Sequence, residues 1–205
     1  MRYEAARPLI KDGDVLLFES KGWVAATIRW ATRSTYSHAA LAVWWGDRLM
    51  VVESREGAGC RAVPLSSAVR SSNITLYRVV TQVPVGTPEF AAHVARVEGD
   101  AEIEGRRQAV GDVAIGRLGQ PYGWWSILRD ALSRLPVLAL FWRRRHYSID
   151  DLEDPGVRVK CSTLVALAWR QGAGLDLVPN LADRSTDPGD LARSAALRRL
   201  YTLEP

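Results

Sequence analysis

The sequence predicts an α+β domain in which an antiparallel sheet packs against a few helices. Short apolar runs bounded by turn residues extend from Gly13 to Val80 and predict strands. Helical periodicity begins at Pro88, and one more apolar run lies near the end of the chain. Strands followed by helices and a final strand are typical of an α+β fold. The 205 residues, 47% of them hydrophobic, suit a single domain spanning 1–205.

The clearest strand signal is a hairpin. HAALAVWW (38–45) and LMVVES (49–54) flank the dipeptide Gly46-Asp47, which favours a two-residue turn. Pro64 favours an edge strand or a strand end, because proline cannot donate a backbone hydrogen bond. The other predicted strands are GDVLLFES (13–20), CRAVPL (60–65), ITLYRVV (74–80) and LRRLYTL (197–203).

Helices are expected mainly in the second half of the chain. Residues 88–118, rich in Ala, Glu and Arg, predict a helical insertion into the domain, and 143–156 predict a polar loop. The other predicted helices are WVAATIRWAT (23–32), an amphipathic stretch at 124–135, the segment after Cys161 and a short helix beginning in DPGDLARS (187–194).

The helix that begins at Cys161 raises a chemical question. Cys161, Leu164, Val165 and Ala168 follow the spacing of a buried helical face, and Gly172 and Gly174 predict its end. A thiol in the first turn can be a small core side chain. It can also be a nucleophile, because the positive end of the helix favours its thiolate. The helix pattern alone leaves both interpretations open.

Composition excludes several classes of protein. Cys60 and Cys161 are the only cysteines, so no disulfide framework is expected and a reducing compartment is the simpler interpretation. No CxxC, HxH or HExxH spacing occurs, and we expect no metal site and no cofactor. The net charge is +4, and no nucleic-acid-binding motif accompanies it. The run Arg143–Arg145 predicts a solvated face or, as a less favoured interpretation, a peripheral contact with an anionic partner such as a membrane.

No targeting or membrane-spanning segment is expected. Residues 1–20 lack an uninterrupted apolar region and a small-residue cleavage site. The most apolar stretch, 123–142, contains Arg129, Asp130 and Pro136, which argue against a membrane span. A cytoplasmic location is therefore expected.

The hairpin turn places two polar residues side by side. With Gly46-Asp47 as the turn, Ala40 faces Glu53, and His38 lies on the same face as Ala40, diagonal to Glu53. Such a diagonal spans roughly 5–8 Å between β-carbons, which lets a carboxylate hydrogen-bond an imidazole. A slip of one residue would put His38 and Glu53 on opposite faces.

Together with Cys161, these residues form the nucleophile, base and orienting carboxylate of a cysteine hydrolase. Each has a plainer interpretation, since Cys161 could be core packing, His38 an edge or core residue and Glu53 a solvated strand end. In the catalytic interpretation, the pKa of Cys161 is lowered, whereas Cys60, at a strand start, keeps a pKa near the ordinary ~8.5.

Three segments carry a family resemblance: YSHAALAVWWGDRLMVVES (36–54), GQPYGWW (119–125) and KCSTLVALAW (160–169). Together they resemble the circularly permuted branch of the NlpC/P60 papain-like superfamily, the YiiX/YaeF-like proteins, whose arrangement is similar to that of lecithin retinol acyltransferase. TDPGDLARS (186–194) also resembles the closing segment of that family. The family pattern falls on Gly13 and Asp14, Ser37 and His38, Glu53, Gly119 and Tyr122, and Cys161 and Ser162.

The resemblance implies a papain-like hydrolase or acyl-transfer enzyme. Cys161 would be the nucleophile, His38 the proton carrier and Glu53 its orienting group, with Tyr122 and the Cys161 backbone N–H at the oxyanion site. Ser162 and Trp124 are further candidates for substrate binding, although a place in the core stripe of the 124–135 helix is the favoured interpretation of Trp124.

The resemblance also implies the partners. The wider superfamily implies cell-wall peptides as substrates, and the permuted branch implies lipids or acylated substrates, whereas no obligate protein partner and no nucleic acid are implied. The alternative function is a non-catalytic lipid- or membrane-binding module on the same fold, docking through Arg143–Arg145.

Overall fold

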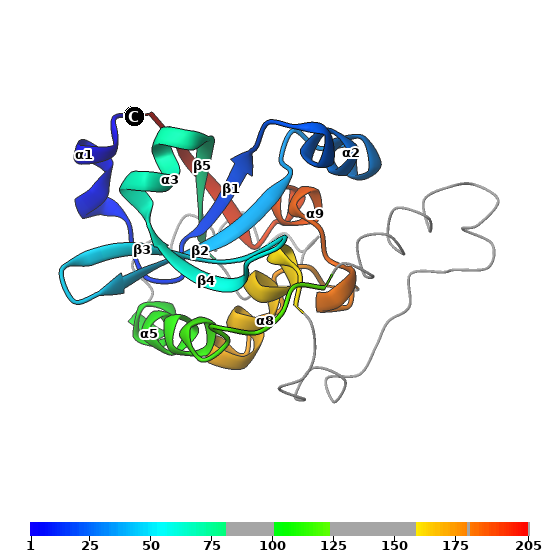
Figure 1. The fold of residues 1–205 in the computed structure, drawn as a ribbon. Helices are drawn as coiled ribbons and strands as arrows, with labels where there is room; N and C mark the ends of the chain where they lie inside the picture. Colours follow the sequence, from blue (N-terminus) through cyan, green and yellow to red (C-terminus); the bar gives the residue numbers. More distant parts are fainter. Residues whose placement is uncertain (81–100, 124–158, 180, 205) are drawn as a thin grey trace.

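A six-stranded antiparallel sheet, in the order β4-β3-β2-β1-β5-β6, forms the centre of the protein (Figure 1). The structure is a computed structural model and describes residues 1–80, 101–123, 159–179 and 181–204. The strands are β1 (Val15–Glu19), β2 (His38–Trp45), β3 (Arg48–Arg55), β4 (Gly59–Pro64), β5 (Asn73–Val79) and β6 (Leu197–Leu203). All the strands predicted from the sequence are therefore confirmed.

The described helices surround this sheet. They are α1 (Tyr3–Ala6), α2 (Trp23–Thr32), α3 (Leu65–Ser71), α5 (Ala101–Ile115), α8 (Cys161–Ala173) and α9 (Pro188–Arg193), with short 3₁₀ turns at Arg7–Leu9 and Asp183–Ser185. The helices predicted at 23–32, after Cys161 and in DPGDLARS are confirmed. The predicted helix at 124–135 and the loop at 143–156 lie outside the described residues, as does the 88–100 part of the predicted insertion.

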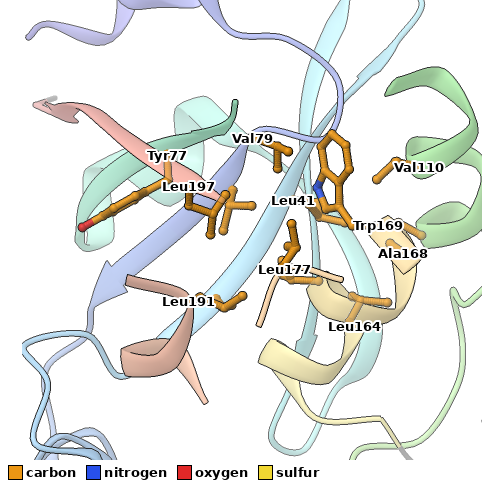
Figure 2. Packing of buried hydrophobic residues seen from close by; sticks show 14 of the residues in the cluster. Leu41, Tyr77, Val79, Val110, Leu164, Ala168, Trp169, Leu177, Leu191 and Leu197 are labelled. Atoms are coloured by element: carbon orange, nitrogen blue, oxygen red, sulfur yellow. The ribbon is translucent and has the colours of Figure 1, made fainter. Parts of the chain in front are cut away.

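The sheet buries both of its faces. On one face, Leu41 of β2 and Val52 of β3 pack with α5 and α8, and Figure 2 shows Val110, Leu164 and Trp169 closing over this layer. On the other face, the alternating side chains of the same strands pack with α1 and α3. Because side chains alternate along a strand, the continuous apolar runs of β1 and β2 supply both layers.

The hairpin register follows the sequence prediction. Leu41 pairs with Val52 and Trp45 with Arg48, so Gly46-Asp47 forms the two-residue turn, with Gly46 at a φ of 61°. Pro64 ends β4, which is an edge strand of the sheet. Pro64 therefore lies both on an edge strand and at a strand end, the two positions that were predicted for it. A proline is tolerated there although it lacks a backbone N–H.

The end of α8 differs in one detail from the prediction. Gly172 lies inside the helix, and Gly174 ends it in the left-handed conformation, with its N–H donating to the Arg170 carbonyl at 2.9 Å. Gly172 has another role, because a Cβ there would lie 2.6 Å from the backbone of Val110 in α5. The glycine permits the two helices to approach closely.

A buried ionic cluster joins α5 to the sheet. Asp14 is fully buried and accepts hydrogen bonds from Arg78 Nε on β5 at 2.9 Å and from Arg107 Nη1 on α5 at 3.3 Å. The indole N–H of Trp169 donates to the Gly13 carbonyl at 3.0 Å. These contacts hold α5 and α8 against the same end of β1, since breaking a buried pair would leave a charge uncompensated.

Candidate active site

His38 and Glu53 meet where β2 begins and β3 ends. His38 Nε2 and Glu53 Oε2 are 2.7 Å apart, and the Glu53 carboxylate is almost completely buried. The alternation of side chains around the Gly46-Asp47 turn puts them on the same face, so the geometric prediction from the hairpin is confirmed. Glu53 is not the solvated strand end of the plainer interpretation.

Cys161, the first residue of α8, completes this arrangement. The His38 side chain and the backbone N–H of Ala39 lie close enough to its sulfur to lower the pKa of the thiol. Because Nε2 of His38 is engaged by Glu53, Nδ1 is the ring nitrogen that remains for Cys161. The imidazole therefore lies between the thiol and the carboxylate. His38 can face Cys161 because it occupies the first position of β2, beside the beginning of α8.

The electrostatics of the three groups favour an ion pair. Burial opposes the charged form of His38, but Cys161 and Glu53 outweigh it and raise the pKa of His38 to about 9. Burial likewise disfavours the Cys161 thiolate, yet His38, the Ala39 N–H and Lys160 lower the pKa of Cys161 overall. The pKa of Glu53 falls to about 2, against the effect of burial, because of His38 and Arg61. The three groups thus favour the imidazolium of His38 and the carboxylate of Glu53 at neutral pH, and they favour the thiolate of Cys161 over its usual degree of ionisation.

The helix terminus adds to this preference. The first N–H groups of a helix have no intrahelical acceptor, and the helix dipole places partial positive charge at that end. Cys161 is the first of 13 residues in α8, directly at this end. The predicted environment for a thiolate is therefore present in the structure.

Tyr122 lies next to the same thiol. It forms an isolated parallel bridge with Val159, two residues before Cys161. Burial and the nearby Cys161 charge raise the pKa of Tyr122 well above its ordinary value, so its hydroxyl stays protonated. A protonated phenol can donate a hydrogen bond to an anion, which is the property that an oxyanion site requires.

The backbone of β4 holds the segment before Tyr122. The Cys60 N–H donates to the Gln120 carbonyl at 2.8 Å, and the Gly119 N–H donates to the Cys60 carbonyl at 2.8 Å. Gly59, at a φ of +69°, lies so close to Gln120 that a Cβ would collide with its carbonyl oxygen. A glycine at this position lets the two segments pair.

Two other predicted substrate-binding residues have different surroundings. Ser162 is buried, and its hydroxyl donates to the Thr186 carbonyl at 2.6 Å, which ties α8 to the segment before α9. The hydroxyl proton is thus engaged within the protein. Trp124 lies outside the described residues.

Arg61 is a site residue that the sequence analysis did not identify. It lies on β4 directly opposite Glu53, and its Nε and Nη2 atoms donate to Glu53 Oε1 at 2.9 and 2.8 Å. One signal for Arg61 was present in the sequence. In the strand CRAVPL (60–65), side chains alternate between the two faces of the sheet, and Arg61 is the one charged residue. Using this signal requires the β3–β4 register, and the three residues 56–58 between these strands are not a two-residue turn of the kind that specified the β2–β3 register.

The second cysteine has a different environment from the one expected. Cys60 is buried, and burial raises its pKa to about 11 instead of leaving it near the ordinary value. The expectation was wrong because the 119–122 segment covers the beginning of β4, a contact that lies far away in sequence. The contrast between the two thiols is consequently larger than predicted.

In the described part of the chain, no three His, Cys, Asp or Glu side chains gather so that they could hold a metal ion. None of the helices described there has both the length and the apolar content to cross a bilayer.

Comparisons with known proteins give one informative likeness. No family model matches the sequence, and no curated protein matches it. The structure is similar to that of the metalloprotein yiiX from Escherichia coli O157:H7, with a TM-score of 0.61 and 15% identity. The match covers 96% of this chain and 99% of yiiX. A likeness at this identity shows the fold alone, and it confirms the YiiX-like part of the resemblance at that level.

Proposed function

We propose that this protein is a cysteine hydrolase or acyl-transfer enzyme that acts on an amide, ester or thioester through Cys161, His38 and Glu53. The observation that carries the proposal is the arrangement of three side chains, in which the His38 ring interacts with the Cys161 sulfur and shares a hydrogen bond with the Glu53 carboxylate. A nucleophile, a base and an orienting acceptor in this order are the requirements for nucleophilic acyl chemistry.

The first half of the reaction uses the ion pair. The Cys161 thiolate attacks the substrate carbonyl carbon and forms an S–C bond, while the carbonyl electrons move onto oxygen. The Tyr122 hydroxyl and the Cys161 backbone N–H are suited to stabilise this oxyanion. When the tetrahedral species collapses, Nδ1 of His38 donates its proton to the leaving nitrogen, oxygen or sulfur, and an acyl-thioester remains on Cys161.

The second half returns the enzyme to its starting state. Water or another acceptor gives up a proton to Nδ1 of His38 and attacks the thioester carbonyl. The S–C bond breaks, the acyl group leaves on the acceptor, and Cys161 is again a thiolate beside an imidazolium. Throughout, Glu53 holds Nε2 and therefore the orientation of the ring.

We further propose that the chain is a circularly permuted relative of the papain-like NlpC/P60 enzymes. Here His38 and Glu53 precede Cys161 in the sequence, whereas unpermuted members run from Cys to His. A catalytic triad depends on geometry and not on chain order, so the reversed order is compatible with the same chemistry. The α+β fold with an antiparallel sheet and the likeness to yiiX support this proposal.

The described site does not suit a resident metal ion. The structural neighbour is titled a metalloprotein. In this chain, both oxygens of Glu53 already have partners, His38 on one side and the positively charged Arg61 on the other. A guanidinium within hydrogen-bond distance disfavours a second cation at the same carboxylate. The proposed mechanism accordingly uses no metal.

The substrate class follows only from the family resemblance, which implies peptides of the cell wall or lipid and acylated molecules. The alternative of a non-catalytic membrane-binding module depends on Arg143–Arg145, which lie outside the described residues. The chemistry around Cys161 favours the enzyme, because a binding module has no need of an activated thiol.

Labelling with an electrophilic activity-based probe tests the proposal. A chloromethyl ketone or epoxide probe carrying an acyl or peptidyl group should modify Cys161 in the native protein, as read by peptide mass spectrometry. The Cys161→Ala variant should lose all labelling, while Cys60 should remain unmodified in both proteins. Probe access to Cys161 without labelling would overturn the enzyme assignment.

A further inference from the structure

We propose that Arg61 is a positioning residue of this site, which fixes the Glu53 carboxylate and keeps it ionised so that it can hold His38. This inference rests on the proposed function and extends it to a residue outside the Cys161, His38 and Glu53 set.

The geometry distinguishes Arg61 from an ordinary surface partner. Two of its N–H groups, on Nε and Nη2, converge on the single oxygen Oε1 of Glu53. The other oxygen, Oε2, faces His38. With both oxygens held from opposite sides, the carboxylate cannot rotate without breaking a charge-assisted hydrogen bond.

The position of Arg61 in the sheet explains how it reaches this site. Arg61 is the cross-strand neighbour of Glu53 in the β3–β4 pair, so both side chains project from the same face. The Arg61 side chain is 40% exposed, whereas that of Glu53 is 2% exposed. The half-exposed arginine thus approaches a buried carboxylate from β4, the edge strand of the sheet.

A second arginine provides an internal comparison. Arg55 Nη1 lies 3.7 Å from the same oxygen of Glu53, and its side chain is 44% exposed. It has almost the same charge and exposure as Arg61 but lies beyond hydrogen-bond distance. Any effect of charge alone should therefore be shared by both arginines, whereas positioning should belong to Arg61.

Several other ionisable groups face this site. Glu53 is met by His38 from β2, by Arg55 from its own strand, and by Arg61 and Cys60 from β4. Around Cys161, the further ionisable groups are Lys160, Tyr122 and, near Tyr122, Glu56. Among these, only Arg61 and His38 donate a hydrogen bond to Glu53 in the part of the chain that is described.

The expected consequence of losing Arg61 is an easier protonation of Glu53. Without Arg61, the carboxylate keeps its burial and loses a cationic hydrogen-bond donor, so its pKa moves up from about 2. A protonated Glu53 no longer stabilises the imidazolium, so the proton shared by the pair moves more readily from His38 to the Cys161 sulfur, and less thiolate remains in mildly acidic solution.

The test compares Arg61→Gln, Arg61→Lys and Arg55→Gln in the full chain. Iodoacetamide alkylation of Cys161 is measured against pH by peptide mass spectrometry, and the His38 ring is titrated by NMR. Thermal unfolding checks that each variant is folded. Arg61→Gln should shift the acid limb of alkylation upward by about one pH unit. It should also introduce an inflection in the His38 shifts between about pH 3.5 and 6 that the parent lacks, because a Glu53 carboxyl without Arg61 titrates nearer its ordinary pKa of 4.5 or above.

The control variants decide between positioning and general charge. Arg61→Lys should restore part of the shift, since lysine keeps the charge without the paired N–H groups, and Arg55→Gln should resemble the parent. An unshifted profile in Arg61→Gln, or equal shifts in Arg61→Gln and Arg55→Gln, would overturn the positioning role.

The NMR titration separates this inference from the proposed function. If accessible Cys161 is inert in the parent, the enzyme assignment fails, yet the His38 titration still reports whether Arg61 controls Glu53. If Cys161 is reactive and the His38 shifts of Arg61→Gln match those of the parent, the enzyme assignment stands and the inference about Arg61 fails.

Discussion

His38 and Glu53, on neighbouring strands, share a hydrogen bond of 2.7 Å between Nε2 and Oε2. This contact leaves Nδ1 as the nitrogen that meets Cys161, and it defines both the orientation and the protonation of the ring. Because the Glu53 side chain is only 2% exposed, its charge depends on His38 and Arg61 for compensation.

Replacing Glu53 with glutamine should slow the reaction of Cys161. The Glu53→Gln variant keeps the volume of the side chain and removes the charge that stabilises the imidazolium, so we expect a fold that is retained with lower stability. Turnover of a probe substrate should fall by about 10²-fold or more, by analogy with triad carboxylates. Steady-state kinetics and thermal unfolding measure the two effects. Parental activity in the variant would leave a Cys161–His38 dyad without the carboxylate.

The two cysteines should differ strongly in their alkylation. The pKa of Cys161 is lowered, whereas burial raises that of Cys60 to about 11, so at pH ~6 an alkylating reagent should modify Cys161 first. His38→Ala should remove much of this preference, because it deletes the cation beside the thiolate. The rates come from peptide mass spectrometry of the native protein. A Cys161 that is accessible but inert below pH 7 would instead be a core side chain.

Stability should fall in acid through Glu53. Its pKa is lowered from 4.5 to about 2 in the folded state, so its contribution is present above pH 4.5 and is lost as the pH falls toward 2. The difference in unfolding free energy between the parent and Glu53→Gln should therefore shrink over this window, as measured by urea unfolding at each pH. A difference that stays constant down to pH 2.5 would contradict the prediction.

Near neutral pH, the other two groups should have little net effect on stability. The raised pKa of His38 gives stability that is present below 6.5 and is lost as the pH rises through about 9. The lowered pKa of Cys161 gives stability that is present above 9.0 and is lost as the pH falls. These slopes are opposite, because one proton is exchanged between the two side chains, so we expect the two contributions to offset each other over the pH range in which both groups titrate.

Gly59→Ala should disturb the segment that carries Tyr122. Gly59 has a φ of +69°, and a Cβ would also collide with the Gln120 carbonyl, so we expect a loss of about 2 kcal/mol or more. Gly57→Ala is the matched control, because Gly57 has a φ of +75° and open space around it. Chemical unfolding of both variants isolates the collision from the backbone strain. Equal losses of unfolding free energy in the two variants would mean that the close approach of Gly59 to Gln120 does not contribute to stability.

The local parts of the site could be predicted from the sequence because short-range rules control them. The Gly46-Asp47 turn specifies the β2–β3 register, and the register places His38 and Glu53 on one face. The apolar spacing after Cys161 likewise predicts α8 and its buried face. Each inference depends on residues that are close neighbours in the sequence or are joined by a two-residue turn.

Arg61 and Cys60 show what such rules could not predict. The β3–β4 connection has no two-residue turn signal, so the position of Arg61 opposite Glu53 became evident only from the paired strands. The burial of Cys60 depends on the 119–122 segment, whose hydrogen bonds with β4 join residues about sixty positions apart in the sequence.

By itself, the sequence determined the strands, the hairpin and the helix that begins at Cys161, because apolar periodicity and turn chemistry act over a few residues. Only the tertiary structure decided that Cys161 meets His38, that Tyr122 lies beside that thiol and that Arg61 holds Glu53. These contacts join segments far apart along the chain, and their electrostatics depend on burial, which no local pattern specifies.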